Sequence, residues 1–242
     1  MTNKNGIWLI FLGFFLYLSG CFINLFFSSN LLWGEMEARL STPQSAQRAL
    51  DISCPLMIAP WETATISTVV TNIIATQETK PQVNAFISHG SDTRVVSETL
   101  LLEPFESQAM QWTADSGDIV FERLILVSIL QRPYRNLPSH QGVCSIYVYS
   151  LFGMSGKNTL ILIVEVGVLA TLLGAGILFY RFRPFTNFTR KLLNSNILFL
   201  VLVFAGLFSS LTRLWGLTLF FNATALLVIT VGTVEILFGS KK

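Results

Sequence analysis

Apolar residues follow two different patterns along the chain. Four continuously apolar stretches cover residues 6–27, 159–180, roughly 192–211 and 215–238. Each is long enough to cross a bilayer, because about 20 helical residues at ~1.5 Å rise span a hydrocarbon core of ~30 Å. Continuous apolar sequence predicts helices here, since an isolated strand cannot satisfy its backbone hydrogen bonds in lipid. Only residues 212–214 separate the last two stretches, which predicts a tight antiparallel hairpin.

Between the first two stretches the pattern changes to a period of two. Runs rich in β-branched and aromatic residues are separated by Pro, Gly, Asp and Asn, which is typical of strands joined by turns. The runs are 52–58, 63–72, 82–88, 94–102, 108–114, 119–130 and 143–150. Short strands at this spacing, without helices between them, predict an antiparallel sandwich.

Four regions follow from these patterns. We expect an N-terminal transmembrane helix (1–27), a juxtamembrane helical connector (28–50), an extracytoplasmic β-sandwich (51–157) and a three-helix transmembrane bundle (158–242) with a cytoplasmic loop at 181–191. In the connector, apolar residues recur at helical spacing, and Thr42 and Pro43 offer a cap and a first-turn proline for a second short helical turn. Trp33 is expected at the membrane interface.

Composition supports the membrane interpretation. The chain is 52% hydrophobic and 12% charged, with mean hydropathy +0.58, which excludes a soluble globular protein. A net charge of +2 gives no basis for nucleic-acid binding. The predicted fold class is therefore membrane α-helical, with four transmembrane helices, plus an all-β extracytoplasmic sandwich.

Basic residues predict the orientation of the helices. Arg181, Arg183, Arg190 and Lys191 follow the second helix, the chain ends in two lysines, and Lys4 precedes the first helix. The positive-inside rule places all of these on the cytoplasmic side. We therefore expect a multi-pass protein of a bacterial inner or plasma membrane, with both termini cytoplasmic and residues 28–157 extracytoplasmic.

A second interpretation applies to the N-terminus. The tetrapeptide 18–21, Leu-Ser-Gly-Cys, after Lys4 and an apolar core, is typical of a lipoprotein signal in which Cys21 is acylated. However, the apolar run continues to Phe27, which favours an uncleaved helix with Cys21 as a buried thiol. Possible lipidation of Cys21 is kept as the alternative.

The order and spacing of motifs in the strand region resemble those of a known fold. Cys54-Pro55, Pro60-Trp61-Glu62, the strand that ends in Asn72, and residues 102–107 followed by Trp112 are similar to immunoglobulin-like domains of bacterial envelope proteins. The resemblance covers residues of about 54–150 and implies an ordered module outside the membrane, without implying an activity. The cysteines depart from the antibody pattern, in which the disulfide joins two inner strands around a core Trp.

Cys54 and Cys144 fall in the first and last predicted strands. In a non-reducing compartment, two cysteines of one small domain are expected to pair, so we predict a disulfide between them. Two buried free thiols are the alternative.

No residue pattern predicts catalysis. His89 and His140 fall in predicted loops, and neither has a metal-ligand partner at suitable spacing. The apolar stretches contain no histidine for a haem, and no nucleophile elbow, P-loop or dinucleotide motif occurs. We therefore expect that the protein has no cofactor and no metal site, and that it is not an enzyme.

Polar groups inside the apolar stretches need partners because buried charge in a bilayer is costly. We expect an ion pair between Glu165 and Arg213, and a pair between Glu235 and one of the cytoplasmic arginines. Small and polar residues predict close helix packing, with Asn222 as a hydrogen-bonding residue between helices. The packing residues are Gly167, Gly174, Gly206 and Asn222.

These features predict a non-catalytic structural or accessory subunit of a hetero-oligomeric bacterial membrane complex. Its partners would be lipid and other integral membrane subunits, with a respiratory or photosynthetic electron-transfer complex as the first guess by analogy. The alternatives are a membrane sensor or envelope-binding protein, and an accessory factor of an export machinery.

Overall fold

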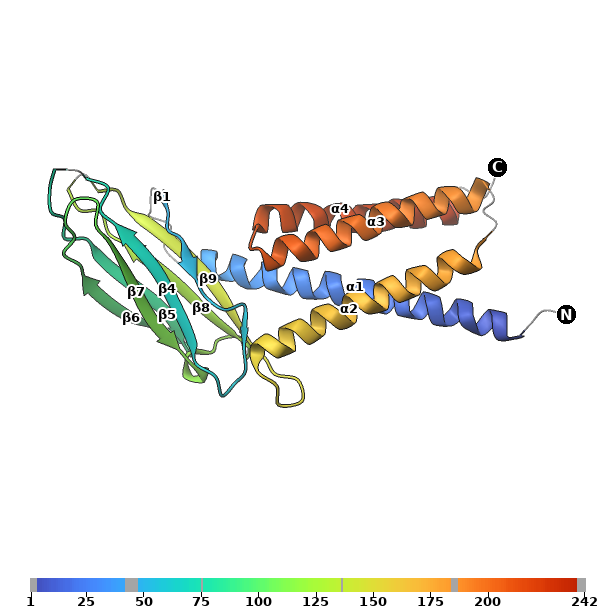
Figure 1. Ribbon diagram of the computed structural model, residues 1–242, viewed down its shortest axis with the longest axis horizontal. Helices are drawn as coiled ribbons and strands as arrows, with labels where there is room; N and C mark the ends of the chain where they lie inside the picture. The colour runs from blue at the N-terminus through green and yellow to red at the C-terminus, as the bar shows by residue number, and fades with distance from the viewer. Residues whose placement is uncertain (1–3, 42–47, 75, 136, 184–186, 239–242) are drawn as a thin grey trace. The chain divides into compact units, whose positions relative to one another are not determined.

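The computed structural model describes residues 4–41, 48–74, 76–135, 137–183 and 187–238, with the backbone alone for 4–6, 187–193 and 232–238. The chain divides into two compact units (Figure 1). The helical unit contains Met1–Leu32 and Ile161–Lys242, and the sandwich unit contains Trp33–Leu160.

Within the described residues, four helices form at the four apolar stretches. They are α1 (Lys4–Leu40), α2 (Gly156–Arg181), α3 (Asn187–Leu211) and α4 (Trp215–Phe238). Within the described residues, α1, α2 and α3 contain helices that are long and apolar enough to cross a membrane. The part of α4 whose side chains are described, Trp215–Val231, is also apolar but shorter.

Helix α1 differs from the expectation of a span that ends at residue 27 and a separate connector. It continues without a break for 37 residues, or about 55 Å at ~1.5 Å per residue. Its last turns belong to the sandwich unit, where a Cβ on Gly34 would lie 2.9 Å from Ser145 Oγ. The C-terminal part of α1 therefore lies close to β9. The helical turn expected after Thr42 and Pro43 lies outside the described residues, and residues 48–49 form a strand, which corrects the helical prediction at that point.

The described strands of the sandwich unit form two sheets (Figure 1). The larger sheet has the order β1-β9-β8-β5-β6, with β3 also paired to β9, and the smaller sheet has the order β2-β4-β7. The strands are β1 (Arg48–Ala49), β2 (Ile52–Ser53), β3 (Met57–Ile58), β4 (Ala64–Thr71), β5 (Gln82–His89), β6 (Asp92–Thr99), β7 (Ser107–Ala114), β8 (Leu124–Gln131) and β9 (His140–Val148). The predicted antiparallel strands are therefore confirmed in their main positions.

The first predicted strand, 52–58, is divided between the two sheets. β1 and β3 pair in parallel with β9, whereas β2 crosses over to pair antiparallel with β4. Gly142 of β9 permits this crossing, because a Cβ there would collide with Leu50 O and the Ile52 side chain. A uniform period of two cannot reveal that a strand changes sheets.

The predicted strand 119–130 begins later than expected. A short 3-10 helix occupies Ser116–Asp118, and strand β8 starts only at Leu124. Phe121 and Glu122 both adopt positive φ, at 50° and 65°, which turns the chain back before β8. The run of apolar residues at 119–121 therefore belongs to a turn and not to a strand.

One apolar core lies between the sheets. Alternate residues of β4 point into it, so that Ala64, Ile66 and Val70 are buried while Thr65, Ser67 and Val69 are less so. Trp112 and Met110 of β7 face the same core, as do Val83, Ile87, Ile125, Ile129 and Ile146 of the larger sheet. Removal of this apolar surface from water is the main driving force for folding of the unit.

Candidate functional sites

A disulfide joins Cys54 to Cys144, across a sequence separation of 90 residues. Cys144 is fully buried in the core, and Cys54 lies between β2 and β3. The bond therefore fastens the segment that crosses between the sheets to strand β9. Among the described residues Cys21 is the free cysteine, and it is buried in the apolar core of the helical unit.

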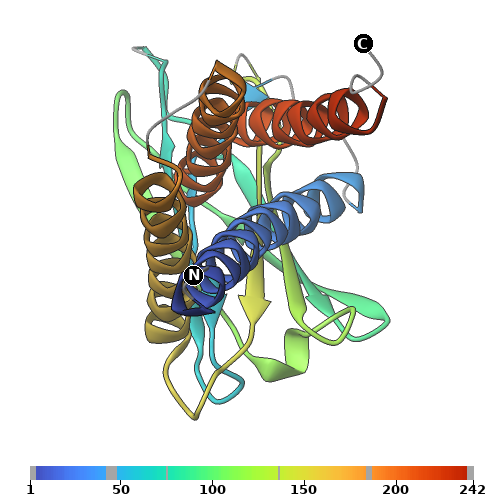
Figure 2. The same ribbon diagram turned by 90° about the vertical axis from the view of Figure 1, so that its right-hand side faces the viewer.

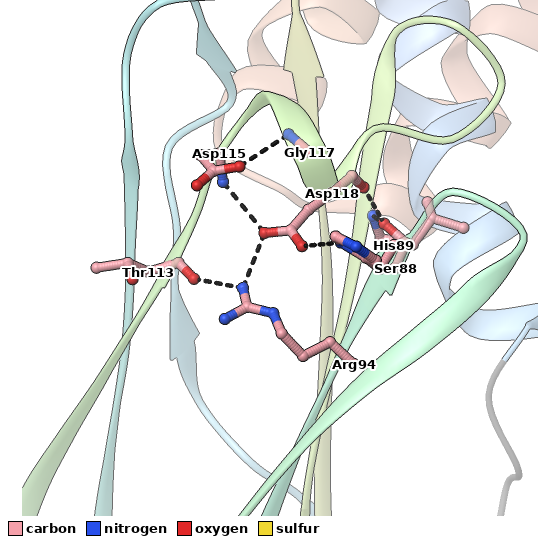
Figure 3. Close-up of polar contacts among 8 residues, drawn as sticks. Ser88, His89, Arg94, Thr113, Asp115, Gly117 and Asp118 are labelled. Carbon is pink, nitrogen blue, oxygen red and sulfur yellow. Dashed lines mark hydrogen bonds and ion pairs between the residues drawn. The ribbon is translucent and has the colours of Figure 1, made fainter.

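The most elaborate polar cluster in the sandwich is built around the carboxylate of Asp118 (Figure 3). Asp118 is only 3% exposed. Its Oδ2 accepts hydrogen bonds from Arg94 Nη2 at 2.8 Å and from the backbone amide of Asp115 at 3.1 Å. Its Oδ1 lies 3.1 Å from Nδ1 of His89, whose side chain is 59% exposed. A buried carboxylate with this many partners is well satisfied.

Further hydrogen bonds extend the cluster to neighbouring strands. Ser88 Oγ donates to the backbone oxygen of Asp118 at 2.6 Å and accepts from the amide of Leu126 at 3.0 Å. Arg94 Nη2 also donates to the backbone oxygen of Thr113 at 2.8 Å. Because Arg94 is on β6 and Thr113 on β7, the guanidinium connects the edge strands of the two sheets.

The cluster fixes the loop between β7 and β8, and its polar groups are hydrogen-bonded to one another. Figure 3 shows His89 and Arg94 converging on Asp118 from different strands. Ser88, the hydroxyl that contacts the cluster, is buried and already makes two hydrogen bonds. Sequence reasoning missed the pairing of His89, at the end of β5, with Asp118, which is 29 residues away in the 3-10 helix. It also placed His140 in a loop, whereas His140 begins β9.

Glu62 links the sandwich to the start of α2. Its Oε2 accepts hydrogen bonds from the backbone amides of Ala59 at 2.7 Å and Gly156 at 2.9 Å. The first turn of α2 contains no acidic residue, so Glu62 supplies the negative charge that the positive end of the helix dipole favours. A shallow groove of about 580 Å³ lies alongside, with Glu62, Ser155 and Lys157 in its lining.

In the helical unit, glycines bring α1 and α2 into backbone contact. A Cβ on Gly20 would meet the carbonyl oxygen of Gly167, and a Cβ on Gly174 would meet the backbone of Gly13 and Tyr17. The glycines are spaced by seven residues on each helix, and their pairing is antiparallel. Of the packing residues expected from the sequence, Gly167 and Gly174 face α1. Small residues allow this approach because they leave the backbones unobstructed.

Asn222 of α4 is hydrogen-bonded to Ser28 of α1. The ribbons of α1, α3 and α4 can be followed in Figure 2. Asn222 Nδ2 donates to Ser28 Oγ at 2.9 Å, and Ser28 Oγ donates back to Asn222 Oδ1 at 3.2 Å. A Cβ on Gly206 would collide with Asn222 Oδ1, so this glycine makes room for the amide. Asn24 makes a similar contact with Thr171 on α2, at 3.2 Å.

The expected ion pair between Glu165 and Arg213 is not among the ion pairs of the described side chains. Glu165 is exposed on α2, and Arg213 lies in the turn between α3 and α4 with φ of 60°. The side chain of Glu235 lies outside the described residues.

Comparison with known proteins does not identify a family. No protein family model and no curated protein matches the chain. A Paenibacillus cycloisomaltooligosaccharide glucanotransferase, complexed with cycloisomaltoheptaose, is similar over 45% of this chain and 15% of its own, with 22% identity and a TM-score of 0.34. The CARDB domain of a Pyrococcus furiosus protein, in complex with di-metal ions, is similar over 45% of this chain and 100% of its own, with 12% identity and a TM-score of 0.33. This chain therefore spans only a small part of the glucanotransferase.

Proposed function

We propose that the protein is a non-catalytic structural or accessory subunit of a multi-subunit bacterial membrane complex. In this proposal the helices pack beside partner subunits in the inner membrane, and the sandwich docks to a partner outside. By analogy, the first host to examine is a respiratory or photosynthetic electron-transfer complex.

The proposal includes four membrane spans. Helix α4 has 24 residues, which is about 36 Å at ~1.5 Å per residue and enough to cross the hydrocarbon core. With four spans and the basic residues on the cytoplasmic side, both termini are cytoplasmic and residues 28–157 are extracytoplasmic. The disulfide in the sandwich supports an oxidising environment for that region.

The proposal also includes an immunoglobulin-like topology for the sandwich. Strands β2, β4 and β7 occupy one sheet, whereas β9, β8, β5 and β6 occupy the other. This strand order supports the proposal, because the A, B and E strands of immunoglobulin-like domains lie opposite the G, F and C strands in a similar way. The departure is the disulfide, which ties the first segment to β9 rather than joining β4 to β8.

The observation that carries the docking proposal is an apolar patch at the end of the sandwich opposite to α2. We call Ile73, Leu101 and Phe105 the distal patch; they are 51%, 56% and 68% exposed. Asn72 holds their two loops together, since its Nδ2 donates to the backbone oxygens of Leu102 at 3.2 Å and Glu103 at 3.0 Å. Large apolar side chains gathered on a supported surface are typical of protein interaction sites.

Replacement of the patch residues tests the proposal. The tagged full-length protein is purified from native membranes in mild detergent, as wild type and as the double variant Leu101→Asp, Phe105→Asp. The control is Val95→Asp, because Val95 is 52% exposed but lies on β6, away from the patch. We expect a stoichiometric partner with wild type and with the control, and at least about a tenfold loss with the double variant.

Two outcomes would contradict the proposal. The wild-type chain purifying alone would argue against a subunit of any complex. A partner retained equally by all three proteins would argue against docking through the distal patch. Identification of the partner also separates the alternatives, since a translocation channel would indicate an export factor.

A further inference from the structure

The strand register brings several connections to one end of the sandwich. Ile58 pairs with Val148 at the end of β9, and Leu124 at the start of β8 pairs with Tyr147. Ala64 at the start of β4 pairs with Ala114 at the end of β7. The connections β3–β4, β7–β8 and β9–α2 therefore lie together, at the end where α2 begins. We call this the proximal end.

Each of these connections exposes a large aromatic side chain. Trp61 lies between β3 and β4 and is 62% exposed, and Phe121 lies between β7 and β8 and is 59% exposed. In the connection from β9 to α2, Tyr149 is 47% exposed and Phe152 is 92% exposed. We call these four residues the aromatic rim.

The loops that carry the rim are held rigidly. Trp61 precedes Glu62, whose carboxylate binds the amides of Ala59 and Gly156. Phe121 follows the Asp118 cluster and makes an edge-on contact with Trp33, at 5.9 Å between ring centroids. The rim residues are therefore presented on supported turns and not on free segments.

The turn around Phe152 has similar support. Ser150 Oγ donates to Met154 O at 2.8 Å, and Met154 N donates to Leu151 O at 2.9 Å. These two bonds close the turn, and Phe152 adopts φ of 52° at its tip. The turn thus presents the phenyl ring of Phe152 to its surroundings, with 92% of the residue exposed.

The position of the rim along the chain indicates what covers it. Phe152 precedes Gly156, the first residue of α2, by only a few residues, and α2 is long and apolar enough to cross a membrane. The first turn of α2 is part of the sandwich unit and is fixed by Glu62. Aromatic rings are enriched at the boundary between lipid headgroups and acyl chains, where one part of the ring is apolar and another is wet.

We propose that the aromatic rim is a membrane-binding surface, in which Trp61, Phe121, Tyr149 and Phe152 insert into the outer headgroup boundary of the bilayer that α2 crosses. The partner of this surface is phospholipid. Lys157, exposed in the first turn of α2, adds a positive charge that suits lipid phosphate at the same level. The inference depends on α2 crossing a membrane and does not depend on the protein being a subunit of a complex.

Depth measurements on the full chain test the inference. Single cysteines are introduced by Trp61→Cys, Phe152→Cys or Phe105→Cys in a Cys21→Ala background, and each is spin-labelled after reconstitution in phosphatidylcholine and phosphatidylglycerol vesicles. Phe105 is the matched control, because it is 68% exposed with φ of 61° but belongs to the distal patch. We expect the ratio of oxygen to nickel-chelate collisions to be several-fold higher at 61 and 152 than at 105. Equal ratios at all three positions would overturn the inference.

A second measurement keeps native tryptophan in place. In a variant with Trp8, Trp33, Trp112 and Trp215 replaced by Phe, brominated phospholipids are expected to quench the fluorescence of Trp61. The control adds Trp61→Phe and Phe105→Trp, and its fluorescence should be quenched several-fold less. Similar quenching of both proteins would contradict the insertion of Trp61 into the lipid boundary.

Discussion

The helical unit and the sandwich unit differ in the residue types that form their packing contacts. In the sandwich, apolar residues of both sheets form the core, and its ionic cluster is concentrated around one carboxylate, that of Asp118. In the helical unit apolar side chains also cover the outside, and the contacts that define the packing involve glycine, Asn, Ser and Thr. Apolar side chains therefore specify the packing of the sandwich, whereas glycine and small polar residues specify the packing of the helices.

The difference in packing residues is the one expected for a unit that folds in water and a unit that packs in lipid. In water, burial of apolar side chains drives association, and a polar group inside requires full pairing. In lipid, an apolar side chain gains little by leaving the acyl chains, so close backbone packing and neutral hydrogen bonds decide which helices meet. The predictions below test this contrast, from the largest expected effect to the smallest.

Removal of the disulfide should have the largest effect, and only on the sandwich. The double variant Cys54→Ser, Cys144→Ser releases a loop closed across 90 residues, which is expected to lower the free energy of unfolding by about 4 kcal/mol. Urea unfolding in detergent, followed by near-ultraviolet circular dichroism, measures this loss. The helical far-ultraviolet signal should persist, and joint loss of both signals at one urea concentration would contradict independent stabilisation of the units.

Substitution of the buried carboxylate should cost somewhat less. Asp118→Ala leaves Arg94 and the amide of Asp115 without this acceptor, and we expect a loss of about 3 kcal/mol. The control is Asp92→Asn, an exposed acid at the start of β6, for which we expect a change of less than about 0.5 kcal/mol. Equal urea midpoints for the two variants would show that the cluster contributes little to stability.

In the helical unit, two glycines of α2 give a matched comparison. A Cβ on Gly174 would collide with the backbone of α1, whereas a Cβ on Gly176 has nothing within 4 Å. We expect Gly174→Ala to destabilise the helix packing by about 2 kcal/mol, because the backbones must separate. Gly176→Ala should be stabilising by about 0.5 kcal/mol through helix propensity. Thermal unfolding in detergent distinguishes them, and a similar response from both would exclude Gly174 as a packing residue.

The link between Glu62 and α2 should have a smaller effect. Glu62→Gln keeps the shape of the side chain but removes the charge that the first amides of α2 favour, at a cost of about 1 kcal/mol. Hydrogen exchange at Gly156 should accelerate in this variant. Glu98→Gln, an exposed acid of β6, is the control and should leave that exchange unchanged.

Tyr147 predicts an effect that appears only at high pH. Burial raises the pKa of Tyr147 from 10.0 to about 12, although Arg123 and the backbone of Gly34 act in the opposite direction. Because the folded state favours the neutral phenol, this contribution is complete below pH 10 and is lost as the pH rises towards 12. Stability of wild type should therefore fall more steeply in this range than that of Tyr147→Phe. Parallel stability curves would contradict the shift.

Local sequence predicted the elements of both units because helices and strands leave different patterns of apolar residues along the chain. Uninterrupted apolar residues at 159–180 predicted α2, and alternation at 63–72 predicted β4. The cysteines could be paired from their compartment alone, before any geometry was known. The function stays a proposal, since no residue pattern in the chain identifies a reaction.

Contacts between distant residues could not be predicted in this way. The pairing of His89 and Arg94 with Asp118, the support of α2 by Glu62, and the contact of Gly174 with α1 all join segments that lie far apart in the chain. Glu165 and Arg213 were expected to meet because their depths matched, but depth does not determine which face of a helix a residue occupies. The sequence by itself determined which segments become helix or strand, because that depends on local period and solvent. The tertiary structure decided which faces meet, because that depends on register and on where a missing Cβ allows two backbones to touch.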